Sequence, residues 1–205
     1  MHGETVAWMR KTASEKNAAI AGSVIIFENN NFYNRFLFVH PSGEINFYNK
    51  RHLFTLAGED KVYESGKEKI VVDYKGWKIC PLVCYDLRFP VWSKNTWNDG
   101  VYEYDFLLYI ANWPAARSYA YRQLLIARAI ENQCYVAAVN RVGIDGKGTN
   151  HQGDSTLIDF KGKHLVEIAP DEEGMETLNL DYAKLADFRK GFMVGMDWDR
   201  FEIRG

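Results

Sequence analysis

A cysteine at the end of an apolar run is the first candidate for chemistry in this sequence. The stretch ICPLVCYDLRFP, residues 79–90, places Cys84 where a buried strand gives way to polar residues and a turn. A tight strand-to-turn geometry would expose the Cys84 sulfur and direct the backbone amides of Tyr85 and Asp86 toward an oxyanion formed by nucleophilic attack. The alternative from position alone is a small buried hydrophobic residue, as most free cysteines are.

A nucleophilic cysteine needs a partner that lowers the pKa of its thiol or accepts its proton. The candidates are Lys50, which ends the strand pattern FYNK, and the two loop histidines His52 and His151. Spacing alone does not choose among these three partners. The other two cysteines, Cys80 and Cys134, lack comparable flanking residues, and we predict that they are structural.

Length and composition narrow the class of protein that carries these residues. The 205 residues are 47% hydrophobic, which is enough for one substantial core. The 25 Lys and Arg against 27 Asp and Glu give a net charge of -2, which excludes a basic nucleic-acid footprint. Three cysteines favour a reducing compartment over a disulfide framework, and no segment reaches the roughly 18 apolar residues of a membrane helix. We predict a single cytoplasmic domain over residues 1–205, with a small-molecule partner, no nucleic acid and no membrane.

The hydrophobic pattern predicts an α/β fold around the candidate residues. Helical periodicity covers residues 4–17 and 116–132, and Asp181 opens a last helix. The strand pattern covers residues 18–27, 32–39, 44–48, 70–74, 77–83, 105–111, 134–140, 155–160, 164–168 and 176–180. The succession of strand, helix and strand over residues 105–140 indicates a parallel crossover. Pro81 lacks an amide hydrogen, so we predict a bulge in the strand that delivers Cys84.

Three stretches, taken together, identify a family. They are INFYNKRHLF at residues 45–54, LVCYDLRFPVWSKN at residues 82–95, and YIANWPAARS at residues 109–118 with RAIENQCYVAAVNRVG at residues 128–143. In order and spacing they resemble the nitrilase superfamily of carbon-nitrogen hydrolases, and within it the omega-amidase branch, which cleaves small ω-amides of dicarboxylic acids. The resemblance covers nearly the whole chain. It implies a four-layer αββα sandwich and a catalytic triad of Glu, Lys and Cys, with no metal or cofactor.

The resemblance also implies a role for individual residues. Cys84 in LVCYD matches the family's nucleophile, and Lys50 in YNKRH matches its catalytic lysine. Glu59 in AGEDKVY matches a second glutamate close to the triad, although without the resemblance it reads as a solvated loop charge. In such enzymes the thiolate attacks the amide carbon, and the lysine and a backbone amide after the cysteine steady the oxyanion. Ammonia then leaves, and water hydrolyses the thioester.

We predict that four further residues bind the substrate: Tyr85, Asn112, Trp113 and Arg117. Asn112 and Trp113 follow a strand end in ANWP, and Arg117 stands at the start of a helix. A guanidinium suits the second carboxylate of a dicarboxylic substrate such as 2-oxoglutaramate or succinamate, because its planar donors match a carboxylate. The alternatives are a packed tryptophan and a surface arginine.

One part of the family pattern has no match. The family's first glutamate lies in a strand, helix, strand unit that precedes the helix expected at residues 4–17, and no glutamate here corresponds to it. We therefore expect an N-terminally truncated sandwich. The chain is then a truncated product or late start, uses another group as base, or is a non-catalytic relative, a pseudoenzyme or binding module of the same fold. A hydrolase pairing Cys84 with His52 or His151 is a weaker third hypothesis.

The resemblance further implies a homodimer or higher homo-oligomer, because members of the superfamily commonly dimerise through faces of the sandwich. An aromatic-rich tail near the C-terminus offers cover for such a face: Phe192, Met193, Met196, Trp198 and Phe201. The alternative is that this tail packs on its own domain.

Overall fold

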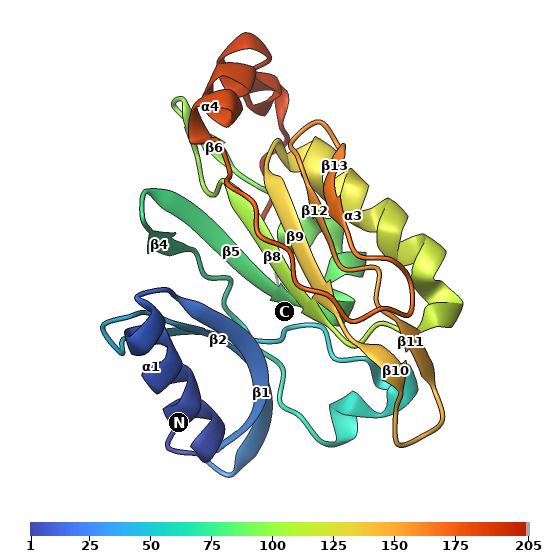
Figure 1. Ribbon diagram of the computed structural model, residues 1–205. Helices are drawn as coiled ribbons and strands as arrows, with labels where there is room; N and C mark the ends of the chain where they lie inside the picture. The colour runs from blue at the N-terminus through green and yellow to red at the C-terminus, as the bar shows by residue number, and fades with distance from the viewer. Residues whose placement is uncertain (204–205) are drawn as a thin grey trace.

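The computed structural model describes residues 1–203, in which two β-sheets face each other (Figure 1). The first sheet contains β1 (Ile20–Glu28), β2 (Asn31–Val39) and β3 (Ile45–Asn49), all antiparallel and in that order. The second contains β4 (Val72–Tyr74), β5 (Trp77–Val83), β8 (Phe106–Ala111), β9 (Tyr135–Asn140), β12 (Thr156–Ile158) and β13 (His164–Glu167). Its spatial order is β13-β12-β9-β8-β5-β4.

Two long helices cover the outer faces of these sheets. In α1 (Glu4–Lys16), Val6, Met9 and Ala13 recur at helical spacing and pack on the outer face of the first sheet. The inner face of that sheet joins a second core with the larger sheet, and α3 (Ser118–Asn132) joins the same core from the far side. The order helix, sheet, sheet, helix is the predicted four-layer αββα sandwich.

The other elements are short. They are the helices α2 (Pro90–Ser93) and α4 (Tyr182–Gly191), the ribbons β6–β7 (Trp97–Asn98 with Val101–Tyr102) and β10–β11 (Val142–Ile144 with Asn150–Gln152), and the 3-10 helices η1 (Thr55–Ala57), η2 (Glu59–Lys61), η3 (Cys84–Arg88), η4 (Ala115–Arg117) and η5 (Val194–Asp197). Both predicted hairpins of the large sheet are present, and β8 pairs in parallel with β9 across α3. None of the helices in residues 1–203 is long and apolar enough to cross a membrane.

The predicted bulge at Pro81 is wrong. The register between β5 and β8 runs without a shift from Ile79 opposite Phe106 to Val83 opposite Ile110. On its other side, β5 pairs with β4 only as far as Ile79. Pro81 therefore lies beyond that neighbour, and its missing amide hydrogen removes no hydrogen bond to β4.

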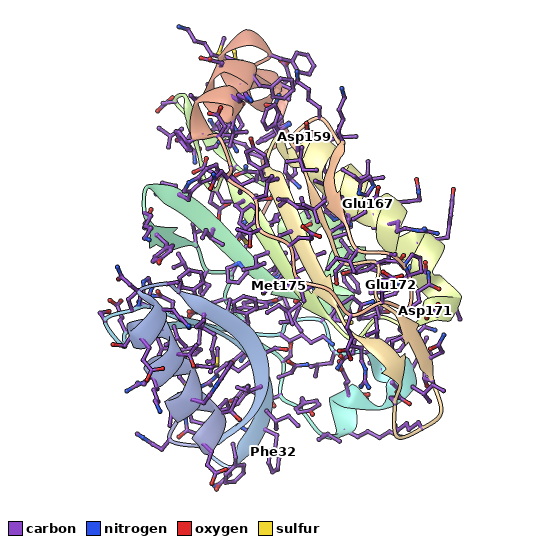
Figure 2. The ribbon with its side chains drawn as sticks, in the orientation of Figure 1. Phe32, Asp159, Glu167, Asp171, Glu172 and Met175 are labelled. Atoms are coloured by element: carbon purple, nitrogen blue, oxygen red, sulfur yellow. The ribbon has the colours of Figure 1, made fainter. Side chains whose placement is uncertain are left out.

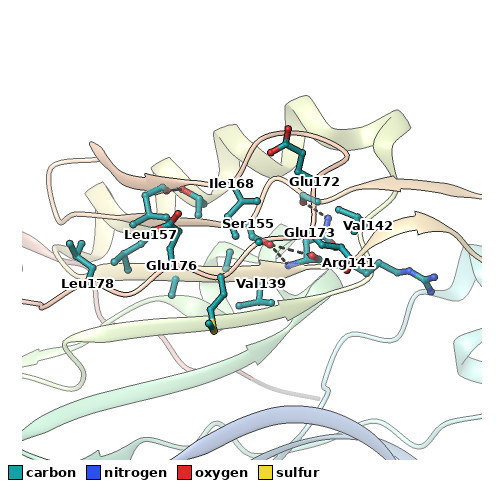
Figure 3. Close-up of a pocket in the computed structure, with 18 of the residues that line it drawn as sticks. Val139, Arg141, Val142, Ser155, Leu157, Ile168, Glu172, Glu173, Glu176 and Leu178 are labelled. Carbon is teal, nitrogen blue, oxygen red and sulfur yellow. Dashed lines mark hydrogen bonds between the residues drawn. The ribbon is translucent and has the colours of Figure 1, made fainter.

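The predicted strand at residues 176–180 is also wrong. This segment is extended but pairs with no strand of the described chain. Glu176, Leu178 and Leu180 instead line a pocket of about 890 Å³ over β9 and β12 (Figure 3). Glu172 and Met175, which precede this segment, line the same pocket and are exposed (Figure 2). The alternation of apolar residues here reflects contact with a sheet face, not membership of its hydrogen-bonded ladder.

The tail after α4 packs partly on its own chain. The Trp198 ring lies 5.7 Å from that of Tyr102 and 3.5 Å from the Lys94 ammonium. Phe192 and Met196 remain exposed. The homo-oligomer stays a prediction.

Candidate active site

All the predicted site residues line one pocket of about 950 Å³: Lys50, Glu59, Cys84, Tyr85, Asn112, Trp113 and Arg117. The pocket lies where the carboxyl ends of the parallel strands β5 and β8 meet, which is where open α/β sheets commonly place their ligands. The loop after β3, with η1 and η2, supplies another wall, and the turn between β10 and β11 supplies the rim.

Cys84 stands at a sharp turn between β5 and η3. Its φ of 45° is in the left-handed region, which costs a non-glycine residue roughly 1–2 kcal/mol. The turn leaves the side chain half-buried in the pocket wall, close to the backbone of Asn112, which lowers the pKa of the thiol. The tight strand-to-turn geometry predicted at Cys84 is present, and the left-handed conformation of the cysteine itself is an addition to that prediction.

Burial raises the pKa of the Cys84 thiol above its ordinary value. The positive charge of Lys50 and the N–H of Asn112 lower this pKa, but they do not offset the loss of solvation. At neutral pH the resting site therefore holds mainly the thiol. Attack on a substrate requires that the proton leaves the sulfur during the reaction.

Lys50 follows β3 directly and brings a buried ammonium into the pocket wall. The residue is 2% exposed, and its Nζ donates to Glu59 Oε2 at 2.5 Å. The same oxygen accepts the backbone N–H of Phe54 at 2.7 Å, which fixes the Glu59 carboxylate. Since a buried charge without a partner is strongly unfavourable, Glu59 both stabilises and orients Lys50.

The structure weakens the pairing of Cys84 with a histidine. The His52 ring contacts Asp86 Oδ1 through Nδ1 at 2.8 Å and stacks on Phe89 at 3.7 Å. His151 lines the pocket, and its Nδ1 lies 3.1 Å from the carbonyl oxygen of Thr149. Within residues 1–203, neither histidine hydrogen-bonds to Cys84.

The predicted substrate-binding residues differ in what they offer. The Trp113 side chain is buried and donates its indole N–H to the Arg117 carbonyl at 2.9 Å, so the packed alternative holds for this ring. Arg117 itself is exposed, with its guanidinium 5.3 Å from the ring centre of Phe54. Tyr85 packs 4.9 Å from the same ring, and Asn112 is exposed at the end of β8.

Two polar residues that support the site were not predicted. Asn140, at the end of β9, accepts the Trp113 N–H at 2.7 Å and donates to the Trp113 and Gly153 carbonyls. It holds the loop that carries Asn112. Asp86 was predicted only for its backbone amide, yet its carboxylate is fully buried and hydrogen-bonded. A polar residue that ends a buried strand was the available signal for Asn140.

The environments of the three cysteines predict selective labelling. Cys80 and Cys134 are fully buried, and burial raises the pKa of Cys80 to about 12. We expect a thiol reagent such as Ellman's reagent to modify one cysteine in the folded protein and three after denaturation. Peptide mapping of the folded sample should locate the label at Cys84. Rapid labelling of Cys80 or Cys134 without denaturant would contradict this arrangement.

Within residues 1–203, no group of three or more His, Cys, Asp and Glu side chains is placed to hold a metal ion. Cationic and amide side chains outnumber the two carboxylates, Glu59 and Asp145, in the pocket lining: Lys50, Arg88, Asn112, Arg117 and Lys147. Such groups suit an anionic or carbonyl-bearing ligand.

Comparison with known proteins shows which family this chain belongs to. The family model described as carbon-nitrogen hydrolase matches residues 1–190. Omega-amidase YafV of Escherichia coli K12 is 46% identical over 200 residues, which are 98% of this chain and 76% of that protein. The 2-oxoglutaramate amidase of Bacillus subtilis 168 is 36% identical over 190 residues, 92% of this chain and 71% of that protein.

Solved structures place the fold in the same group. XC1258 from Xanthomonas campestris, described as a CN-hydrolase superfamily protein with an arsenic adduct in the active site, is 46% identical to this chain. Its TM-score is 0.97, and the match covers 100% of this chain and 78% of that one. Nit3 of Saccharomyces cerevisiae, at 20% identity and a TM-score of 0.78, shares the fold over 92% of this chain and 69% of its own. By sequence and by structure, this chain belongs to the carbon-nitrogen hydrolase family.

Proposed function

We propose that this chain hydrolyses the terminal amide of small linear monoamides of dicarboxylic acids, through a thioester on Cys84. The observation that carries the proposal is the meeting of Cys84 and the buried Lys50 ammonium in one pocket, with Glu59 bound to that ammonium. The relatives named omega-amidase and 2-oxoglutaramate amidase support the choice of an amide as substrate.

The proposed reaction has two steps. The Cys84 sulfur attacks the amide carbon, the C–N bond breaks, and the thiol proton leaves with the amine as ammonia. Water then adds to the thioester, which releases the carboxylic acid and returns a proton to the sulfur. Lys50 and the backbone N–H of Tyr85 stabilise the oxyanion in each step, because fixed donors in a site of restricted solvent access favour developing negative charge. The N–H groups at the start of η3 have no acceptor within the helix.

Recognition of the second carboxylate is assigned to the cations on the pocket rim. Arg117 and Arg88 both line the pocket, and the Arg88 guanidinium lies 4.8 Å from the Trp113 ring centre. Asp145, also on the rim, accepts the backbone N–H groups of Lys147 and Thr149 with its Oδ1 atom. These hydrogen bonds lower the pKa of Asp145.

The test is ammonia release from 2-oxoglutaramate, succinamate and butyramide, with intact-mass analysis of acid-quenched samples. We expect turnover of the first two and an acyl adduct on the protein. Butyramide should react at least about tenfold more slowly in kcat/KM, because hydrogen bonds to a charged group contribute ~1.5–3 kcal/mol. In Arg117→Met the ratio of kcat/KM between the two carboxylate-bearing amides and butyramide should fall.

One result would contradict the proposed hydrolysis. A folded protein that binds these amides saturably but releases no ammonia and forms no adduct would replace the proposed enzyme with a non-catalytic binding module of the same fold.

A further inference from the structure

The Asp86 carboxylate is fully buried beneath the site, and both of its oxygens are saturated with hydrogen bonds. Oδ2 accepts the Tyr48 hydroxyl at 2.8 Å and the Val83 backbone N–H at 3.0 Å. Oδ1 accepts the His52 backbone N–H at 3.0 Å and lies 2.8 Å from the His52 ring nitrogen Nδ1. Four bonds fill the acceptor positions of an ionised carboxylate.

The direction of the Tyr48 bond follows from its other partners. The Tyr48 oxygen accepts the indole N–H of Trp92 at 2.9 Å and the backbone N–H of Arg51 at 3.1 Å. Both lone pairs of the hydroxyl are therefore occupied, and its hydrogen is directed to Asp86. Burial, and then the negative charge of Asp86, raise the pKa of Tyr48 well above its usual value, so the hydroxyl keeps this hydrogen.

The positions of these partners in the chain give the carboxylate its importance. Val83 immediately precedes Cys84, while Tyr48 and His52 stand two residues before and two residues after Lys50. The carboxylate thus joins the end of β5 to the end of β3 at the points where these strands deliver the thiol and the ammonium.

We propose, on the basis of the amide hydrolysis proposed above, that Asp86 is the positioning residue that holds Lys50 in place relative to Cys84. Packing on both sides reinforces this role. The His52 ring stacks on Phe89 with an interplanar angle of 5°, and the Arg51 guanidinium lies 4.5 Å from the Trp92 ring centre. The joined segments therefore behave as one rigid unit under the pocket.

The decisive variant is Asp86→Asn, which keeps the size of the side chain but places an amide NH2 against groups that are themselves donors. We expect kcat for 2-oxoglutaramate to fall about a hundredfold, since a displacement of about 1 Å in a catalytic group has an effect of this size. KM should change little, because Asp86 does not line the pocket.

The reactivity of the thiol gives a second readout, which requires no turnover. Lys50 lowers the pKa of the Cys84 thiol, and the charge of Asp86 raises it to a smaller degree. Loss of the Asp86 charge alone would shift the pH midpoint of iodoacetamide labelling downward. Displacement of Lys50 from Cys84 would shift it upward. We expect the upward shift in Asp86→Asn, and we expect no upward shift when Lys50→Met is already present.

Asp105→Asn is the matched control. Asp105 is also a buried carboxylate; it binds Arg189 Nη1 at 2.6 Å and the Lys78 N–H at 3.1 Å, away from the pocket. It should lose stability, but kcat and the labelling midpoint should stay at their wild-type values. If Asp86→Asn does not fold, His52→Phe removes only the ring contact and keeps the stack on Phe89. That variant should show a smaller loss of kcat and a smaller upward shift of the labelling midpoint.

A folded Asp86→Asn with wild-type kcat and an unchanged or lower labelling midpoint would overturn the positioning role. Equal losses of kcat in Asp86→Asn and Asp105→Asn would also overturn it, because they would trace the effect to general instability. If no amide is turned over but the upward shift is present, the proposed function fails and the positioning of Lys50 by Asp86 stands.

Discussion

Replacement of Cys84 by alanine should reduce ammonia release from 2-oxoglutaramate at least ~10³-fold, because it removes the atom that forms the covalent intermediate. Lys50 and the backbone donors would remain, but without a nucleophile to attack the amide no oxyanion forms for them to stabilise. The acyl adduct should also disappear from the intact mass of quenched samples. Steady-state ammonia assays and mass spectrometry on the same preparations measure both effects.

Cys134→Ala is the matched control for this variant. Cys134 is a fully buried thiol outside the pocket, so its loss should affect stability and leave turnover unchanged. Substantial ammonia release by folded Cys84→Ala would rule out the thioester route and require a different nucleophile in the pocket.

Lys50→Met should lower kcat by ~10²–10³-fold, the range found when one oxyanion donor is removed. Methionine fills much of the same volume without the ammonium. The pKa of the Cys84 thiol should rise further, because the positive charge that lowers it is gone. Since the thiolate is the reactive form, iodoacetamide labelling below this pKa should slow, and its midpoint should move to higher pH.

Lys69→Met provides the comparison for Lys50. Lys69 also forms an ion pair within the fold, with Glu103 Oε2 at 2.8 Å, but it does not line the pocket. Its loss should leave kcat and the labelling midpoint of Cys84 unchanged. If Lys50→Met kept near-normal kcat while His151→Ala abolished it, the reaction would belong to a cysteine and histidine pair.

The sequence predicted most of the elements because burial in this fold follows simple periods. Val6, Met9 and Ala13 face the core at helical spacing, and the strands that deliver Lys50 and Cys84 end where their apolar runs end. The strand prediction was wrong at residues 176–180, where the alternating Leu178 and Leu180 line a pocket over the face of the sheet and pair with no strand of the described chain. The hydrophobic pattern of a segment indicates which of its side chains are buried. Whether the segment belongs to a sheet depends on which other backbone lies beside it.

The residues of the site could be predicted from the sequence, but the contacts that join them could not. Spacing alone left Lys50, His52 and His151 equal, because β3 and β5 come together only through tertiary packing. The resemblance singled out Lys50, and membership of the carbon-nitrogen hydrolases is confirmed. The Asp86 contacts could not be read from the sequence, since an aspartate after a strand usually indicates an ordinary turn.

The left-handed backbone conformation at Cys84 sets the stability of the fold against the need for a reactive side chain at this position. Glycine would adopt the same φ without steric penalty, so replacement of Cys84 by glycine should relieve the strain of the local backbone. Thermal selection on a library randomised at residue 84 would therefore drift toward glycine, and selection for turnover would draw the same library back to cysteine. One backbone torsion thus separates what the fold prefers from what the chemistry demands.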